Sequence, residues 1–332
     1  MSADIDRETE PNDVTSSRNS VRVHSTASGL LLVDKPQGWT SHDAVARTRR
    51  LAGTRKVGHA GTLDPMATGL LILGINSSTR LLTFIVGLDK EYLATIRLGS
   101  ATTTDDAEGE ELSRAPAASV ALIGPADVAA GIALLTGAIS QQPSAVSAIK
   151  VDGKRAYARV RDGEDVQLPS RPVTVAAFEL LSSRVLDGFL DLDVRVGCSS
   201  GTYIRALARD LGAGLGVGGH LTALRRTRIG PFHIDNAQPL AELDVPAGLI
   251  SPADAATRVL GRIDLTAQQA IDLGHGKRID VAVDVDVAAG TEAPLAAIAP
   301  GGRLIGLVEL RGTQARTVIN FPPDDAVKGE TS

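Results

Sequence analysis

The stretch from Gly58 to Gly69, GHAGTLDPMATG, holds one carboxylate, Asp64, among three glycines and directly before a proline. Pro65 biases Asp64 away from helical geometry toward an extended backbone, so we expect this carboxylate on a loop. The glycines let the backbone turn and let a large ligand approach closely. Such a loop suits a nucleophile or a general base. The alternative is an Asx turn, in which Asp64 bonds only its own backbone.

The composition narrows the class of protein. The chain of 332 residues is long enough for two domains, and 43% hydrophobic residues support a substantial core. It contains no run of 18 apolar residues and no apolar N-terminal signal region, so we expect a cytoplasmic protein without membrane spans. The single cysteine, Cys198, excludes an internal disulfide and a zinc site of several cysteines, and the six histidines are scattered. We therefore expect no metal.

The net charge of −5 does not indicate nucleic-acid binding, but the basic residues are clustered. Residues 40–60 and residues 202–230 each contain five basic residues against one acidic residue. The first patch consists of Arg47, Arg49, Arg50, Arg55 and Lys56, and the second of Arg205, Arg209, Arg225, Arg226 and Arg228. Two such patches favour a surface for a phosphate backbone, and solvated helix faces are the alternative.

Three further motifs accompany the carboxylate loop. They are DKPQGWTS at 34–41, KEY at 90–92 and SSGTYIRALARDLG at 199–212. Together the four motifs resemble the TruB family, the bacterial tRNA pseudouridine-55 synthases, in order and in spacing. The resemblance runs from about Gly29 to Phe232, with Trp39 as a local variant. It implies the pseudouridine-synthase fold.

The resemblance also implies three catalytic residues. Asp64 matches the family's catalytic aspartate, which acts as a nucleophile or abstracts a ribose proton. Arg205 matches the arginine that pairs with this carboxylate, and a planar guanidinium orients a carboxylate through paired hydrogen bonds. Tyr92 matches the tyrosine that stacks on the target base and is placed for proton transfer at C5. Taken singly, Arg205 would read as an exposed helix arginine and Tyr92 as a half-buried strand residue.

Four more positions match family residues that bind the substrate. His59 falls where family members insert a histidine into the tRNA T-loop. Tyr203 and Leu224 match positions that line the uracil pocket, although both also suit an ordinary core. Lys35, in the DKP block, supports either the loop or the RNA backbone.

Apolar periodicity predicts an α+β fold. We expect strands over 30–33, 70–75, 92–98, 146–151, 173–185 and 189–196, with turns at Asp152-Gly153 and Asp187-Gly188. Helices are expected from Ser41, as the cap, to Gly53, and over 78–86, 125–135 and 203–211. The family fold implies a mixed, largely antiparallel sheet flanked by these helices.

The chain divides into three parts by composition. Residues 1–28 are polar and predict a disordered tail, and residues 29–255 form the catalytic domain. The boundary region, residues 235–261, reads as a linker with helical content. Residues 262–325 contain short strands over 295–298, 304–310 and 317–321 between glycine turns, which predicts a small β-rich domain. The resemblance implies that this domain is PUA-like and binds RNA.

The resemblance predicts a stand-alone enzyme that isomerises the T-loop uridine at position 55 of tRNA after flipping it from its stack. Isomerisation gains and loses no atoms, so we expect no cofactor. GLGVGG at 214–219 satisfies GxGxxG but follows a predicted helix, and we do not read it as a dinucleotide site. The T-stem-loop of tRNA is the expected partner, with no obligatory protein partner. The alternatives are an RNA-binding or RNA-folding module and a synthase for another RNA.

Overall fold

The computed structural model describes residues 27–144, 150–151, 154–155, 169–281 and 293–324. The strands of the main sheet are β1 (Gly29–Lys35), β2 (Val57–Ala60), β3 (Thr68–Ile75), β4 (Lys90–Leu98), β7 (Gly137–Gln141), β10 (Arg171–Leu186), β11 (Phe189–Cys198), β12 (Gly219–Ile229), β13 (Phe232–His233) and β14 (Gln238–Pro239). Their order is β14-β1-β3-β12-β4-β11-β10-β7, with β2 paired to β3 and β13 to β12. Only β1–β14 and β3–β12 are parallel among these pairs, which confirms the predicted mixed, largely antiparallel sheet.

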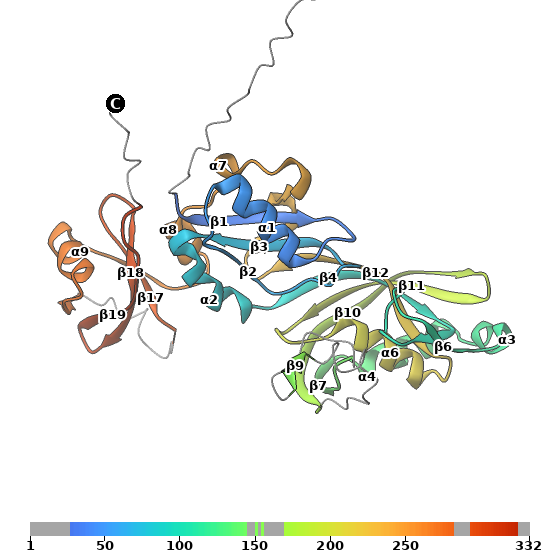
Figure 1. Ribbon diagram of the computed structural model, residues 1–332. Coiled ribbons are helices and arrows are strands. Elements are labelled where there is room, and N and C mark those ends of the chain that lie inside the picture. Colours follow the sequence, from blue (N-terminus) through green and yellow to red (C-terminus); the bar gives the residue numbers. More distant parts are fainter. Residues whose placement is uncertain (1–26, 145–149, 152–153, 156–168, 282–292, 325–332) are drawn as a thin grey trace, which may run out of the picture.

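Helices cover both faces of this sheet (Figure 1). The α-helices are α1 (Ser41–Ala52), α2 (Leu82–Val86), α3 (Ala117–Ala121), α4 (Pro125–Leu134), α6 (Ile204–Gly214), α7 (Val245–Gly248), α8 (Pro252–Thr257) and α9 (Ala267–Gly274), and 3-10 helices cover Asn76–Leu81, Ile234–Asn236 and Leu240–Glu242. Because side chains alternate along a strand, Leu31 and Val33 of β1 pack on the α1 side, and Leu30 and Leu32 on the side of α2 and α8.

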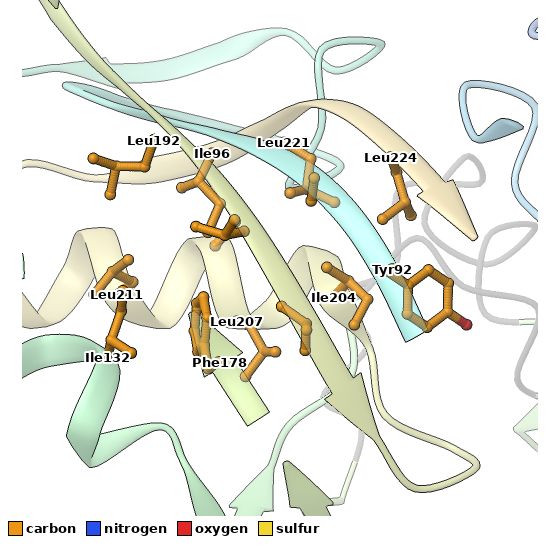
Figure 2. Close-up of a cluster of buried hydrophobic side chains, with 14 of the residues drawn as sticks. Tyr92, Ile96, Ile132, Phe178, Leu192, Ile204, Leu207, Leu211, Leu221 and Leu224 are labelled. Atoms are coloured by element: carbon orange, nitrogen blue, oxygen red, sulfur yellow. The ribbon is translucent and has the colours of Figure 1, made fainter. Parts of the chain in front are cut away.

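The half of the sheet that includes β4, β11 and β10 packs against α6. Tyr92 and Ile96 of β4 point toward Ile204 and Leu207 of α6, and Tyr92 lies at one end of this apolar cluster (Figure 2). The β10–β11 hairpin turns at Asp187-Gly188, where both residues have positive φ, 53° and 80°. This confirms the predicted turn, because positive φ at both central residues is the pattern of a type I′ turn, whose twist matches that of the strands.

Two small hairpins complete this half. The first consists of β5 (Ser100–Thr102) and β6 (Glu111–Arg114), and the second of β8 (Lys150–Val151) and β9 (Lys154–Arg155). The loop between β5 and β6 carries several carboxylates that matter for the site below. The predicted tail falls mostly on residues 1–26, and the predicted Asp152-Gly153 turn on residues 152–153; both ranges lie outside the described residues.

The N-terminal cap of α1 differs from the prediction. Thr40, not Ser41, is the cap: its hydroxyl accepts from the Asp43 backbone N–H, and the Asp43 carboxylate accepts from the Thr40 N–H. Ser41 is the first helical residue, and its hydroxyl bonds Leu63 instead. At the other end Gly53 has φ +63°, so the predicted glycine stop is confirmed.

The boundary region after β13 is not a linker. Its strand β14 pairs in parallel with β1, and the backbones of Ile250 and Leu30 exchange two hydrogen bonds. Leu240, Leu243 and Val245 are buried in the same cluster as α1. Composition did not reveal this because the segment's contacts are to residues about two hundred positions earlier in the chain.

The C-terminal region forms a second sheet of five strands, ordered β15-β17-β18-β19-β16. The strands are β15 (Arg262–Asp264), β16 (Ile279–Asp280), β17 (Leu295–Ile298), β18 (Leu304–Arg311) and β19 (Gln314–Asn320). The predicted strands at 295 and 304 are present, whereas the third begins at Gln314 instead of Thr317. Ala296, Leu307 and Phe321 share one apolar cluster with α2 and α8, so the two sheets are joined by a common core.

The second half of the carboxylate motif is held by contacts between β3 and β12. Gly69 pairs with Arg226 in parallel, and its φ is +100°. A Cβ atom at this position would overlap the backbone oxygen of Arg226 and lie 2.9 Å from its nitrogen. Both the dihedral and the close approach therefore require glycine here.

Phe321→Ala should lower the free energy of unfolding by about 3–5 kcal/mol, because Phe321 is 2% exposed and fills the core between the two sheets. Urea unfolding followed by circular dichroism measures the loss. Val318→Ala, at a position 38% exposed, is the control and should cost less than about 1 kcal/mol. Equal losses in the two variants would mean that the shared core adds little.

Gly69→Ala should destabilise the protein by about 3 kcal/mol, because alanine meets both the unfavourable dihedral and the backbone of β12. Gly87→Ala is the matched control: Gly87 has φ −74° and open space around it, so its effect should stay within about 0.5 kcal/mol. Thermal or urea unfolding of both variants tests the difference, and a stable Gly69→Ala protein would show that the strand contact is not required.

Candidate active site

The loop between β2 and β3 presents Asp64 to solvent. Its side chain is 40% exposed, whereas Leu63 and Met66 beside it are buried in the core with Tyr92. The Ala67 N–H donates to the Asp64 carbonyl at 3.1 Å, which closes a tight turn at Pro65. This turn uses the backbone oxygen, so the carboxylate itself stays available. Apolar neighbours therefore anchor the loop on both sides of an exposed acid.

Three neighbouring segments hold the loop. The Ser41 hydroxyl donates to the Leu63 carbonyl at 3.2 Å and accepts from the Leu63 N–H at 2.9 Å. The Gly38 N–H donates to the Pro65 carbonyl at 2.8 Å. Arg226 of β12, 1% exposed, donates to the carbonyls of Gly61 and Leu70 at 2.9 and 2.8 Å. These bonds fix the backbone on which Asp64 stands.

Lys35 is fully buried beneath this loop. Its ammonium donates to the carbonyls of Trp39 at 2.6 Å and Pro36 at 3.1 Å, and lies 3.5 Å from that of Pro65. Burial lowers the pKa of Lys35 to about 8, although the negative charge of Asp64 opposes this shift. Of the two roles left open by the sequence, the geometry favours support of the loop, because a buried ammonium cannot reach an RNA phosphate directly.

Arg205 joins Asp64 to a second carboxylate. Its guanidinium is 9% exposed and lies 3.0 Å from Asp64 and 3.2 Å from Asp106. It also donates to the Thr104 carbonyl at 2.8 Å. Asp106 is 4% exposed and accepts from the Thr104 hydroxyl and the Glu108 N–H. The sequence did not single out Asp106 as a site residue, because nothing in the sequence of the β5–β6 loop reveals its contact with α6.

The start of α6 is held in place by Gln141. Its amide donates to the Tyr203 carbonyl at 2.9 Å and accepts from the Tyr203 N–H at 2.7 Å, and its side chain is 1% exposed. Tyr203 is the N-terminal cap residue of α6, two positions before Arg205. Tyr203 is half-buried, and this burial raises its pKa. The two-point contact therefore sets the position from which Arg205 reaches the loop.

Tyr92 and Leu224 lie together beside the loop. Both are 8% exposed and belong to the same cluster as Met66, with Leu224 on β12 opposite Ala94 of β4. In Figure 2 the Tyr92 hydroxyl points out of this cluster. Burial raises the pKa of Tyr92, so its hydroxyl remains protonated at neutral pH.

His59 precedes Asp64 in the same motif, on the strand that leads into the loop. It stands on β2, half-buried, and its ring packs against His42 at the start of α1. Burial is the main reason why the pKa of His59 is below its ordinary value. Asp64 is paired with Arg205, and its charge acts on the hydroxyls of Tyr92 and Tyr203. Leu224 shares the apolar cluster of Tyr92, whereas His59 contacts α1 through His42.

The two arginine patches differ in exposure. In the second patch Arg205 and Arg226 are buried, and the rest form ion pairs: Arg209 with Asp105, Arg225 with Asp34 and Arg228 with Asp89. This patch is therefore not the free phosphate surface that the sequence suggested. In the first patch Arg47 and Arg49 donate to backbone carbonyls, while Arg50, Arg55 and Lys56 are exposed.

Within the described ranges, no group of three or more histidine, cysteine, aspartate or glutamate residues could hold a metal ion. In the same part of the chain, no helix is both long and apolar enough to span a bilayer.

Three family models match consecutive parts of the chain. Residues 49–204 match the N-terminal domain of TruB family pseudouridylate synthase, residues 205–254 the tRNA pseudouridylate synthase B C-terminal domain, and residues 260–322 the tRNA pseudouridine synthase II C-terminal model. Among curated relatives, tRNA pseudouridine synthase B of Leifsonia xyli is 65% identical over 90% of this chain and 98% of its own. That of Paenarthrobacter aurescens is 55% identical over 89% and 96%.

Solved structures of lower identity share the fold. An H/ACA RNP bound to a substrate RNA containing 2'-deoxyuridine has a chain that matches with TM-score 0.66 at 22% identity, over 91% of this chain and 87% of that one. A Cbf5-Nop10-Gar1 complex gives TM-score 0.66 at 22% identity, over 90% and 87%. Because the family models cover most of the chain and the curated relatives match along nearly their whole length, the chain belongs to the TruB family of pseudouridine synthases.

Proposed function

We propose that this protein isomerises uridine 55 in the T-loop of tRNA to pseudouridine. The observation that carries the proposal is the exposed carboxylate of Asp64, held 3.0 Å from the buried guanidinium of Arg205 in a chain of this family. The reaction breaks the N1–C1′ bond, turns the uracil and rejoins it through C5, so it needs a positioned carboxylate at the ribose. Membership of the family and the names of the close relatives support tRNA as the substrate.

Asp64 attacks C1′ as a nucleophile or takes a proton from the ribose, and both routes require that the target nucleotide leave its stack. Arg205 orients the Asp64 carboxylate. The second ion pair of Arg205, with Asp106, keeps the guanidinium from moving toward solvent with Asp64. A guanidinium held between two carboxylates and the Thr104 carbonyl has little freedom to rotate. This arrangement keeps the reacting oxygen at a constant place.

The remaining residues hold the flipped base. Tyr92 stacks on the uracil, with Leu224 and Tyr203 as further walls of the pocket. Since burial raises the pKa of Tyr92, its hydroxyl stays protonated at neutral pH and assists proton transfer at C5 as a hydrogen-bonding group and not as a phenolate base. Lys35 contributes through the loop that it supports, and His59 enters the space that the flipped base leaves.

A larger surface would hold the rest of the tRNA. Residues 29–255 form the catalytic domain, residues 262–325 a PUA-like RNA-binding domain, and residues 1–28 a tail. The common core of the two sheets supports a fixed platform for the stem and the loop of the substrate. The enzyme works in the cytoplasm and needs neither a cofactor nor a protein partner.

Asp64→Asn should abolish isomerisation while tRNA affinity stays nearly intact, because the change removes one carboxylate and no phosphate contact. The assay is tritium release from C5 of uridine in unmodified tRNA, together with filter binding. A rate within about tenfold of wild type, a barrier change of only ~1.4 kcal/mol, would remove Asp64 from the chemistry. Asp264→Asn, at an exposed carboxylate of the C-terminal sheet, is the control.

Further substrates in the same assay separate the proposed function from the alternatives, an RNA-binding or RNA-folding module and a synthase for another RNA. A tRNA with cytidine at position 55 should release no tritium, and release from it would assign the activity to another uridine. Wild-type protein that binds tRNA without any release would be an RNA-binding or RNA-folding module. Release from ribosomal RNA fragments alone would indicate a synthase for another RNA.

Replacing Arg50, Arg55 and Lys56 together by glutamine should weaken tRNA binding and reduce the slope of log Kd against log salt by about 2–3. These three cations are exposed, and within the described residues no carboxylate lies within ion-pair distance of them, so their charges are available to phosphates. Arg195→Gln, whose guanidinium is paired with Glu179, is the control. An unchanged slope in the triple variant would place the phosphate path elsewhere.

A further inference from the structure

His42 and His59 form an aromatic pair at the edge of the carboxylate loop. Their ring centroids are 5.8 Å apart and their planes meet at 76°, which is the edge-to-face geometry that aromatic rings prefer. His42 is exposed on the first turn of α1, and His59 is half-buried on β2. The pair therefore joins a helix that begins beside the loop to the strand that leads into it.

No hydrogen bond fixes the buried side of the His59 ring. Its Nδ1 atom is buried and has no hydrogen-bond partner among the described residues. A histidine ring is usually oriented by the bond that one of its nitrogens makes. The edge-to-face contact with His42 is another contact that can orient the ring.

The backbones on both sides of the pair are firmly held. His42 follows Ser41, whose hydroxyl makes two hydrogen bonds with Leu63 of the loop. His59 pairs with Leu73 of β3, on the strand that also carries Gly69. With both backbones fixed, the orientation of the His59 ring depends on its side-chain contacts, and the His42 ring is one of them.

Burial, and then the charges around the pair, keep His59 neutral. Asp43 of α1 lies near His42, and Arg226 of β12 lies near His59. Burial first, and then the neighbouring charges of His42 and Arg226, hold the pKa of His59 below its ordinary value of 6.5. At neutral pH its imidazole is therefore uncharged, and a neutral ring enters a stack of bases at lower desolvation cost than a cation.

We propose that His42 is a positioning residue for tRNA engagement: its ring holds the His59 imidazole in the orientation in which His59 enters the T-loop. This inference rests on the proposed function, in which His59 fills the space left by the flipped base. His42 acts through His59 and not on the reacting atoms. His42 therefore affects the binding of tRNA and not the rate of the chemical step.

The first experiment compares His42→Ala with His42→Phe in steady-state and single-turnover tritium release from tRNA. His42→Ala should raise KM for tRNA about three- to tenfold, the size of an aromatic pair contact, and leave the single-turnover rate at saturation within about twofold. His42→Phe keeps a ring against His59 and should restore most of the affinity. His233→Ala, at an exposed histidine on β13, is the control and should match wild type.

A double-mutant cycle separates positioning from direct RNA contact. In a His59→Ala background, His42→Ala should have no further effect on KM. An equal effect in both backgrounds, or no effect in either, overturns the proposal. A wild-type protein that releases no tritium from any tRNA would instead reject the proposed function, so the two failures are distinguishable.

The ring contact has a spectroscopic signature that does not depend on activity. The chain has six histidines, so their imidazole resonances can be assigned by substitution. In His42→Ala the titration of His59 should move up toward pH 6.5, because both the neighbouring charge and part of the burial are removed. An unmoved His59 titration would show that the rings are not in contact in solution and would also overturn the proposal.

Discussion

The ion pair between Arg205 and Asp64 is the contact on which the site depends. It joins a loop between two early strands to a helix that follows the β10–β11 hairpin, so it forms only when the large sheet is complete. Asp106 shares the same guanidinium. Because one cation lies between two carboxylates, loss of Arg205 would leave two acids facing each other, one of them buried.

The buried cations around the loop hold its backbone through hydrogen bonds. Arg226 and Lys35 are both almost inaccessible, and each donates to carbonyls of the loop or of its neighbouring segments. A buried cation is costly unless its donors are satisfied, and here the carbonyls of an irregular loop satisfy them. The loop in turn can stay irregular because its carbonyls have partners. These hydrogen bonds between buried cations and loop carbonyls explain how the exposed Asp64 is held on a rigid backbone that lacks regular secondary structure.

The cations of the two basic patches also differ in whether they have partners within the protein. Most arginines of the second patch are used internally, in ion pairs or against carbonyls, whereas Arg50, Arg55 and Lys56 after and at the end of α1 remain exposed. The same helix begins at His42 and Ser41, beside the loop. One helix therefore connects the exposed cations to the edge of the site, which suits a substrate much larger than a single nucleotide.

The amino-acid sequence by itself determined the family, the α+β class, most strands and helices, the Asp187-Gly188 turn and the identity of Asp64 and Arg205 as a candidate pair. The elements and the turn follow from local patterns of alternation and of glycine and proline positions. The family and the Asp64–Arg205 pair are what the resemblance carried by the contiguous motifs implies. Tertiary structure alone decided that Thr40 caps α1, that residues 235–261 complete the sheet, that Asp106 joins Arg205, and that most of one arginine patch is internal. Each of these depends on a distant segment. The Ser41 hydroxyl is bonded to Leu63 and leaves the cap to Thr40, and the burial or pairing of the other residues is set by the segment that lies opposite them.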